Sequence, residues 1–323
     1  MDKLDNVKTY KVTEPFLDLN CGLGEAPFWE GGGRVRFVDI VKQKLHFVDL
    51  EKGASSLTSV DLPISIGTTA NVEGHDDGFA FLGKHGFGYY DKAKGTHRYI
   101  KKMWTEEEIA DGKEERMRGN DGAVDSRGRY WAGAMNDPLV KEPSDEGVLF
   151  RLDPDLSLHR ILSNVTIPNG ISWSPDDRTM YFTDSPSGQI TAYDFAAATG
   201  RICNPRPFFR IPRSGPLAGG VPDGHAVDAD GYLWVAIFGT GRVVRVVPEG
   251  GRDGRRAGEV VALVELPTRC VSCPGFVGEE LLVTSAEEED PDGHPESKRF
   301  QGAVFRVHVG IGGMKLHRFG GKV

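Results

Sequence analysis

The 323-residue sequence contains only four cysteines: Cys21, Cys203, Cys270 and Cys273. They are too few and too scattered for a disulfide framework in a chain of this length. Cys270 and Cys273 form a Cys-x-x-Cys pair, but no second pair supplies zinc ligands and no βαβ pattern surrounds it. We therefore expect buried or bystander thiols in a reducing compartment, and place the protein in the cytoplasm.

Long hydrophobic runs are also missing. No segment approaches the ~20 apolar residues that a membrane-spanning helix needs, and residues 1–15 lack the apolar run of a signal peptide. The formal net charge of −8 and the pI near 5.6 argue against nucleic acid, because its binding depends on clustered Lys and Arg. We expect a small-molecule substrate, with no membrane and no nucleic-acid partner.

The common catalytic signatures are absent as well. The sequence has no Gly-x-Ser-x-Gly elbow, no His-Glu-x-x-His, no Walker loop and no Gly-x-Gly-x-x-Gly that opens a helix. This disfavours a serine hydrolase and a nucleotide-dependent enzyme. Helix is scarce too, since only residues 105–117, with 106–110 inside them, are expected to be helical.

Glycine and proline are abundant, with 42 and 19 residues, and the apolar residues come in short runs that indicate many short strands. Three copies of one pattern begin at Asn120, Asn169 and Asp223. Each has a polar residue beside Gly, an alternating apolar run, a tight turn of Asp, Pro or Gly, and an aromatic-rich run. This pattern predicts a β-hairpin, and its repeat of about 50 residues is typical of propeller blades.

Weaker copies of the pattern lie at residues 32–50, 77–90 and 270–285, so the units beginning at Glu25, near Asn71 and near Ser272 bring the number to six. Runs at 147–152, 189–195 and 241–247 complete the blades. The chain is therefore predicted to be all-β, a single six-bladed β-propeller over residues 1–323 with four antiparallel strands per blade around a central channel. Residues 1–15 are expected to be an N-terminal extension or closing strand, and protected sheet edges favour a monomer or weak homodimer.

The first strand of each propeller blade lines the axis, so Glu25, Asn120, Asn169 and Asp223 should form a ring at the channel mouth. Two carboxylates and an amide oxygen, on Glu25, Asp223 and Asn169, suit one divalent cation with positions left for water and substrate. Oxygen ligands favour Ca²⁺ first, then Mg²⁺ or Mn²⁺, with Zn²⁺ tolerated. The alternative for each Asn-Gly or Asp-Gly pair is an ordinary turn.

Two further aspartates, Asp184 and Asp228, fall later in their repeats. At that position a carboxylate is expected to bond loop backbone rather than a metal.

The chain resembles the senescence-marker-protein, gluconolactonase and luciferin-regenerating-enzyme-like family over residues 20–307. The motifs that carry the resemblance are Leu-Gly-Glu-Ala-Pro-Phe-Trp at 23–29, Arg-Gly-Asn-Asp-Gly at 118–122, Arg-Tyr-Trp-Ala-Gly-Ala-Met at 129–135, Pro-Asn-Gly-Ile-Ser-Trp at 168–173 and Val-Pro-Asp-Gly-His-Ala-Val-Asp at 221–228. The resemblance implies a six-bladed propeller with a metal on Glu25, Asn169 and Asp223, substrate contacts from Arg118, Asn120 and Met135, and Asp223 as general base.

Two positions depart from the family pattern. Ala26 replaces a usual glycine, and His225 replaces a usual apolar residue. Neither change removes a ligating oxygen. His225 is expected to support the site or pack in the core rather than to catalyse, and for Arg118 the alternative is a solvated charge in the 113–118 run.

The predicted activity is metal-dependent hydrolysis of small cyclic esters, such as sugar lactones, by metal-activated water. Loops 136–146 and 286–299 should set specificity. The acidic run at 286–299 is expected to be a solvated surface loop, with a role at the rim against anionic ligands as the alternative. The rival functions are phosphotriester hydrolysis, cyclisation or isomerisation of a secondary metabolite at the same cation, and a non-catalytic metal-binding propeller.

Overall fold

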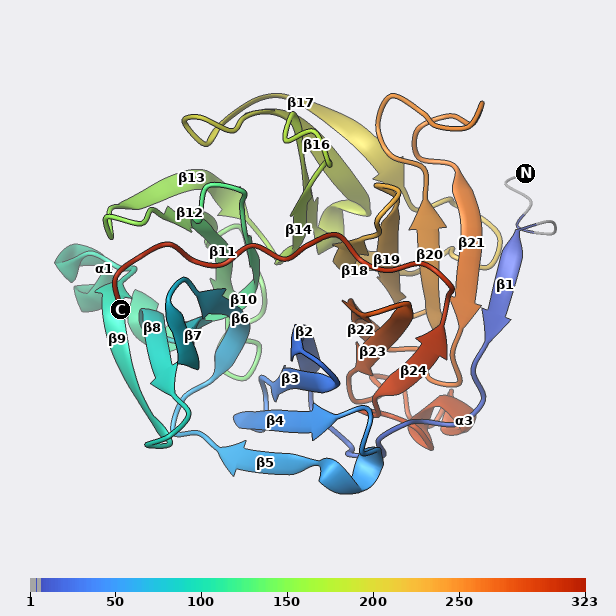
Figure 1. The fold of residues 1–323 in the computed structure, drawn as a ribbon, viewed down its shortest axis with the longest axis horizontal. Coiled ribbons are helices and arrows are strands. Elements are labelled where there is room, and N and C mark those ends of the chain that lie inside the picture. The colour runs from blue at the N-terminus through green and yellow to red at the C-terminus, as the bar shows by residue number, and fades with distance from the viewer. Residues whose placement is uncertain (1–3, 5–6) are drawn as a thin grey trace.

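The structure is a computed structural model that describes residue 4 and residues 7–323, and it places 24 strands in six sheets. The sheets stand around a central axis (Figure 1), which confirms the six-bladed β-propeller. In each blade the strands follow one another in sequence order from the axis outward. Each sequence repeat is therefore one blade, because hairpin turns pair each strand with the next.

The strands fall into four concentric sets. The innermost are β2 (Gly24–Gly31), β6 (Ile66–Val72), β10 (Met117–Val124), β14 (Pro168–Trp173), β18 (Val221–Val227) and β22 (Val271–Val277). The second set is β3 (Arg34–Asp39), β7 (His75–Gly83), β11 (Tyr130–Asn136), β15 (Thr179–Asp184), β19 (Leu233–Phe238) and β23 (Glu280–Ser285). The third is β4 (Lys44–Asp49), β8 (Gly86–Asp91), β12 (Gly147–Leu152), β16 (Gln189–Ala196), β20 (Arg242–Val246) and β24 (Phe305–His308). The outermost are β5 (Thr58–Asp61), β9 (Thr96–Lys102), β13 (Leu158–Val165), β17 (Arg201–Arg210) and β21 (Val260–Glu265).

The last two blades differ from the four-strand plan because the N-terminal segment closes the ring there. Strand β1 (Lys8–Lys11) adds to the outer edge of the fifth blade, parallel to β21. The sixth blade has three strands, and Leu17 forms an antiparallel bridge with Val304 beside them. Residues from the start of the chain thus contact its last blades and tie the closure together.

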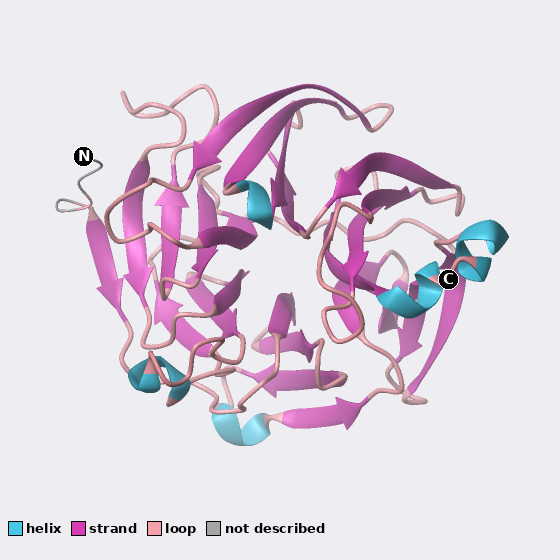
Figure 2. Cartoon of the chain, turned by 180° about the vertical axis from the view of Figure 1, so that it is seen from behind, coloured by secondary structure: helices cyan, strands magenta, loops and turns pink. Residues whose placement is uncertain are grey.

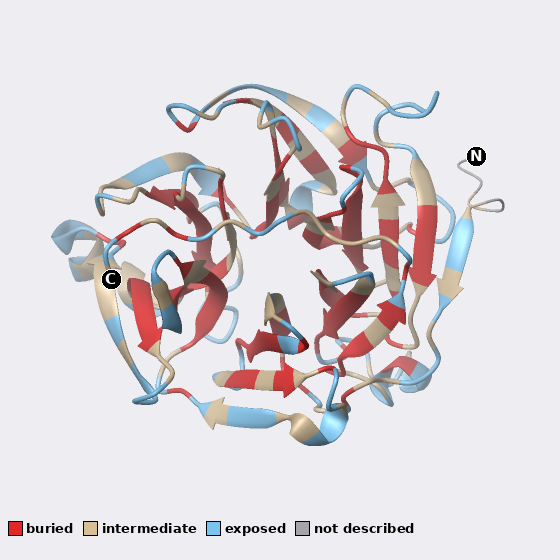
Figure 3. Cartoon of the chain, viewed as in Figure 1, coloured by how far each residue is buried: buried red, intermediate tan, exposed pale blue. Residues whose placement is uncertain are grey.

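The core lies between neighbouring blades. Every residue of β11 and β12 is buried, whereas most of the outermost strands β13 and β17 is not. Figure 3 shows buried segments concentrated in the middle strands and exposed ones at the rim. Sheets that pack on both faces bury nearly continuous apolar runs, which explains the strong apolar content of the middle strands.

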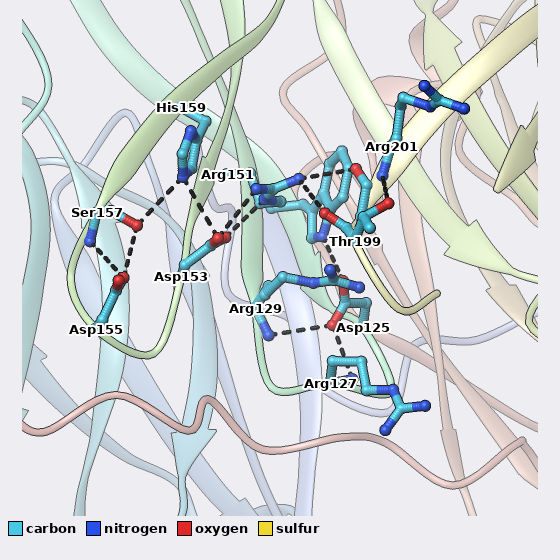
Figure 4. A network of polar contacts seen from close by, with 12 residues as sticks. Asp125, Arg127, Arg129, Arg151, Asp153, Asp155, Ser157, His159, Thr199 and Arg201 are labelled. Atoms are coloured by element: carbon cyan, nitrogen blue, oxygen red, sulfur yellow. Dashed lines mark hydrogen bonds and ion pairs between the residues drawn. The ribbon is translucent and has the colours of Figure 1, made fainter. Parts of the chain in front are cut away.

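Buried aspartates fasten the turn between the first two strands of two blades. Asp228 accepts hydrogen bonds from the backbone N–H groups of Asp230 and Tyr232, from the Trp234 indole at 3.0 Å and from Arg245 Nε at 2.7 Å. Asp125 likewise accepts hydrogen bonds from the backbone N–H groups of Arg127 and Arg129, from Arg129 Nε and from the Trp131 indole. Figure 4 shows Asp125 with Arg127 and Arg129.

Asp184 likewise accepts from the backbone of Thr166 and Ile167. The expectation that Asp184 and Asp228 bond loop backbone is confirmed.

The chain ends in a segment, residues 309–323, that we call the strap. It leaves β24 and crosses the face of the propeller toward the second and third blades (Figure 1). Gly313 bridges to Asp228, Phe319 bridges to Val72, and Gly320 N–H bonds the Gly128 carbonyl. Because Phe319 is fully buried in the core, the strap is anchored at its far end.

The face opposite the strap carries loops 137–146 and 286–304, with α3 (Pro295–Lys298), and the two short helices α1 (Glu106–Ala110) and α2 (Lys113–Arg116). Figure 2 views the protein from this side. Two single-turn 3₁₀ helices complete the structure: η1 (Ala54–Ser56) and η2 (Ser185–Ser187). No helix of the described residues is long and apolar enough to cross a membrane.

The expected helical region is confirmed, since α1 begins after the capping box of Thr105 and Glu108. The prediction that the second unit starts near Asn71 was wrong. Its inner strand begins at Ile66, and Asn71 lies near the far end of β6, where its side chain accepts a hydrogen bond from Arg36 at 2.7 Å. The second repeat has no polar residue at the ring position to mark its start.

Removing the Asp228 carboxylate should strongly destabilise the fold. Asp228→Ala leaves the buried Trp234 indole, two turn amides and the Arg245 guanidinium without their acceptor, which costs about 3–5 kcal/mol. Asp230→Ala is the matched control, because its exposed carboxylate reaches Arg245 only at 3.3 Å and should contribute less than about 1 kcal/mol. Urea denaturation measures the free energy of unfolding of both variants. Equal losses of this free energy would contradict the role given to Asp228.

Candidate metal centre and active site

All six innermost strands have a β-bulge near their start, after the first, second or third residue. The register with the second strand shifts after Glu25, Ile66, Gly119, Pro168, Pro222 and Val271. A bulge leaves residues out of the ladder and re-aims their side chains. Since the bulges coincide in all six blades, the residues in them turn toward the axis at one level.

Three predicted ligands lie in or beside these bulges. Glu25 precedes the bulge of β2, Asn169 lies in that of β14, and Asp223 in that of β18. All three side chains are buried. The axis therefore brings together residues that are far apart in the sequence, in the ring that the sequence analysis predicted. Asn120 joins them from β10.

The glycines after Asn169 and Asp223 are required by the close approach of neighbouring strands. A Cβ on Gly170 would stand 2.2 Å from His225 Nδ1, and one on Gly224 would stand 2.5 Å from Cys273 Sγ. Both contacts are far too short for a real side chain. These Asn-Gly and Asp-Gly pairs are therefore parts of strands at a crowded axis, and the alternative that they are turns was wrong.

Burial and mutual repulsion make the carboxylates at the axis hard to ionise. The pKa of Glu25 is raised well above its usual value by burial and then by the charges of Asp223 and Asp121. The pKa of Asp223 is raised in the same way, by burial and by Asp121, while a hydrogen bond from Asn169 lowers it. Burial raises the pKa of Asp121 to about 6. When these three carboxylates are ionised, the site has an excess of negative charge.

The amide of Asn169 supplies the clearest sign of what this site can bind. Its Nδ2 donates to Ser185 Oγ at 3.1 Å, whereas its Oδ1 is buried and has no hydrogen-bond partner in the protein. A buried acceptor without a donor is costly and calls for an explanation. A hard cation would satisfy the Asn169 oxygen and reduce the repulsion between Glu25 and Asp223, so these residues fit a divalent metal.

Two carboxylates and one amide make up this set. In the described part of the chain, no group of three or more His, Cys, Asp or Glu side chains is gathered closely enough to hold a metal without an amide.

Arg118 lies beside the predicted ligands and is buried, so the alternative of a solvated charge was wrong. Its Nη1 donates to Asn120 Oδ1 at 2.7 Å, and Asn120 Nδ2 donates to the Pro168 carbonyl at 2.8 Å. Burial lowers the pKa of Arg118, which Asp137, Glu25 and Asp223 partly offset. The charge of this guanidinium in turn lowers the pKa of Asp223.

Met135 is the strand partner of Arg118 in the β10–β11 ladder and is buried. Paired residues of an antiparallel ladder lie on the same face of the sheet, so the two side chains are neighbours.

Both departures from the family pattern have structural consequences. Ala26 adopts φ of 49°, a left-handed conformation that favours glycine, and its N–H donates to Glu25 Oε2 at 2.9 Å. Ala26, with its strained backbone, therefore orients the carboxylate of the predicted metal ligand Glu25. His225 is buried, its Nε2 bonds Ser172 Oγ at 2.8 Å, and burial lowers its pKa to about 3. A neutral imidazole bonded to a serine supports the wall of the site.

Asp121 and Cys273 were missed by the sequence analysis. Each is the second residue of its bulge, where β14 and β18 have Gly170 and Gly224. Asp121 and Cys273 therefore place side chains at a bulge position where two other blades have no side chain. Burial raises the pKa of the Cys273 thiol, and Glu25, Asp121 and Asp223 raise it further. The extra residue between Asn120 and Gly122 was the feature of the sequence that could have revealed Asp121.

The acidic run of loop 286–304 is only partly a solvated loop. Glu288 is buried and accepts hydrogen bonds from Ser297, from the Asp290 N–H and from Arg269 Nη1 at 3.2 Å. It fastens the loop to the fifth and sixth blades. The loop follows β23 and so lies at the ring end of the propeller, as does loop 137–146.

Comparisons with known proteins show the family of the chain. The family model described as the SMP-30/Gluconolactonase/LRE-like region matches residues 23–287. Regucalcin of Pongo abelii is 32% identical over 324 residues, covering 95% of this chain and 98% of that protein. YvrE of Bacillus subtilis (strain 168), provisionally named a sugar lactone lactonase, is 29% identical over 95% and 98% of the two chains.

Among solved structures, a regucalcin from Agrobacterium tumefaciens described as a calcium-binding protein superposes with a TM-score of 0.80. It is 24% identical and the match covers 96% of this chain and 98% of that one.

Replacing Asp121 by a neutral residue should stabilise the metal-free protein. Its folded-state pKa lies above its unfolded value, so its ionisation lowers stability as the pH rises from about 4 through about 6. In EDTA at pH 8, Asp121→Asn should raise Tm by about 2 °C or more, with no gain at pH 4. Added Ca²⁺ should reduce or reverse the difference in Tm between Asp121→Asn and the unsubstituted protein. Asp145→Asn, an exposed carboxylate, is the control, and an unchanged Tm for Asp121→Asn at pH 8 would contradict the destabilisation assigned to the Asp121 charge.

Proposed function

Because the chain belongs to the SMP-30/gluconolactonase/LRE-like family, we propose that it hydrolyses small cyclic esters at a divalent cation held by Glu25, Asn169 and Asp223. The matched region contains all three residues and spans five of the six blades and part of the sixth. The relative named as a sugar lactone lactonase matches nearly the whole chain. Sugar lactones are therefore the substrate class that this proposal names first.

The observation that carries the metal dependence is the buried, unpartnered Oδ1 of Asn169 between two carboxylates of raised pKa. The charges support the same conclusion. Glu25, Asp121 and Asp223 carry three negative charges when ionised, and Arg118 supplies one positive charge. A divalent cation would complete the balance in a buried place where unpaired charge is expensive.

A bound divalent cation would polarise an ester carbonyl and stabilise the negative charge that develops on its oxygen. Oxygen donors favour Ca²⁺, with Mg²⁺ and Mn²⁺ next and Zn²⁺ tolerated.

The side chains have separate tasks in this reaction. Asp223 accepts a proton from the attacking water as general base. Arg118 donates to an oxygen of the lactone and is held for this by its own bond to Asn120. Asn120 is oriented in turn by the Pro168 carbonyl, which leaves its Oδ1 to fix Arg118 and a substrate hydroxyl. Met135 packs beside Arg118 and shapes the wall of the substrate pocket.

We include the cellular setting in the proposal. The four cysteines are free thiols, three of them buried, which suits a reducing cytoplasm. The propeller has short edges and we propose that it acts as a monomer or weak homodimer on a small molecule.

Turnover of lactones should depend on the metal. A panel that includes gluconolactone is assayed in EDTA and then with Ca²⁺, Mg²⁺, Mn²⁺ or Zn²⁺ restored, and we expect loss in EDTA and the largest recovery with Ca²⁺. Paraoxon is included because the same site could act on a phosphotriester. Full lactone turnover in EDTA, confirmed metal-free by elemental analysis, would contradict the role of the cation. Binding of Ca²⁺ without turnover of any substrate would indicate a binding protein.

Substitutions should distinguish Asp223, the proposed general base, from Asn169, which is proposed only to bind the metal. Asp223→Asn should abolish turnover at every Ca²⁺ concentration, because the amide cannot take a proton. Asn169→Ala should instead raise the Ca²⁺ concentration for half-maximal activity by about tenfold or more, a loss of about 1.4 kcal/mol, with partial recovery of kcat at saturation. Asp145→Asn, on an exposed loop at the same end, should change neither quantity. Undiminished turnover by Asp223→Asn would reject the assigned base.

A further inference from the structure

A cavity of about 550 Å³ lies along the axis on the strap side of the metal ring. Its walls come from the last residues of the inner strands, and part of its lining comes from the strap at Gly313, Met314 and Leu316. None of Glu25, Asn169, Asp223, Arg118 or Asn120 lines it. The ring of ligands therefore separates this cavity from the end where loops 137–146 and 286–304 lie.

Two exposed apolar side chains line the cavity, beside Lys315, His317 and Arg318 of the strap. Trp29 is 39% exposed and Leu316 52% exposed, and both line the cavity. They belong to the five large hydrophobic side chains that are exposed in the described part of the chain. Aromatic residues continue inward from the mouth of the cavity, with Phe28, Trp173 and Phe276 in the lining. Flat aromatic walls bind flat apolar molecules through large contact area.

A few polar groups gather at the inner end, beneath the metal ring. Asp121, Ser172 and His225 line the cavity there, and the last two are bonded to each other at 2.8 Å. Apolar walls with a small number of convergent polar groups are typical of small-molecule sites, and the volume lies in the range of such sites. The polar groups would fix one edge of a ligand while the walls hold its faces.

Charge in the cavity disfavours an anion. The carboxylate of Glu30 is matched by Arg36 at 2.7 Å and Lys92 at 2.6 Å. Of the described cations on the strap, Arg318 pairs with Asp76 at 2.7 Å, and Lys315 is exposed. The inner end carries the carboxylate of Asp121 and lies next to the ligand carboxylates. A negative ligand would meet repulsion there and no buried cation among the described lining residues.

We propose that this cavity is a second ligand site, distinct from the metal centre, that takes an uncharged planar aromatic molecule entering between Trp29 and the strap. The faces of the ligand contact Phe28, Trp173 and Phe276, and one hydrogen-bonding edge points to Ser172 and Asp121. The site does not depend on the reaction catalysed at the metal ring, so failure of the lactonase assignment leaves it standing.

N-phenyl-1-naphthylamine tests the proposal directly, because it is neutral, aromatic, carries one N–H and brightens in apolar surroundings. Titration of the Ca²⁺-loaded protein should give saturable binding of one probe per chain with Kd of about 10–100 μM. 1-Anilinonaphthalene-8-sulfonate has the same aromatic groups and an added negative charge, and should bind at least about tenfold more weakly. Absence of saturable binding, or equal affinity for the anion, would overturn the proposal.

Three variants locate the probe. Ala226→Trp fills the cavity from a position that lines it and belongs to no core cluster of the described residues, and should weaken binding by about tenfold. Leu316→Asp at the mouth should weaken it by about fivefold. Leu139→Asp is the matched control, since Leu139 is 72% exposed on loop 137–146 at the opposite end and should leave binding unchanged. Leu316 and Leu139 are both exposed, so their replacement keeps the fold.

Competition distinguishes the cavity from the metal centre. Saturating gluconolactone should leave the affinity for N-phenyl-1-naphthylamine within about twofold. Displacement of the probe by gluconolactone, or equal effects of Leu316→Asp and Leu139→Asp, would show that the probe binds elsewhere and would refute the second site.

Discussion

Repulsion among three carboxylates at the axis is the constraint on which the centre of this protein depends. Glu25, Asp121 and Asp223 come from three different blades. The charges of Asp223 and Asp121 raise the pKa of Glu25, and the charge of Asp121 raises the pKa of Asp223. Arg118 offsets only part of their charge, and the Asn169 oxygen beside them has no donor. Such an arrangement lowers the stability of the metal-free fold, and a site of this kind persists where function requires it.

The surrounding structure is rigid enough to hold that arrangement. Middle strands such as β11 and β12 are buried along their whole length, and buried aspartates such as Asp228 fasten turns between strands. The N-terminal segment ties the fifth and sixth blades, and the strap ties several blades on one face. A single rigid ring of blades keeps ligands from distant parts of the sequence in place without any local contact between them.

Backbone geometry at the axis explains both the candidate metal centre and the cavity beneath it. Bulges at one level turn the ring residues inward, and Gly170 and Gly224 let neighbouring strands approach to distances that a Cβ would block. Beyond the bulges, the inner strands contribute aromatic side chains to the cavity. The strap crosses this face of the propeller and forms part of the cavity lining. The same six strands thus serve a charged centre on one side and an apolar chamber on the other.

Much of this was determined by the sequence alone: the repeat of about 50 residues predicts the blades, and the polar residue at one phase of each repeat predicts Glu25, Asn169 and Asp223 at the axis. Local hairpin chemistry is sufficient for these conclusions, because each blade pairs strands that are adjacent in sequence. The inward direction of Asp121 and Cys273, the burial of Arg118 and the crowding that requires Gly170 were decided only by the tertiary structure. They depend on how far a strand of one blade stands from its neighbour in another, and no spacing along the chain records that distance.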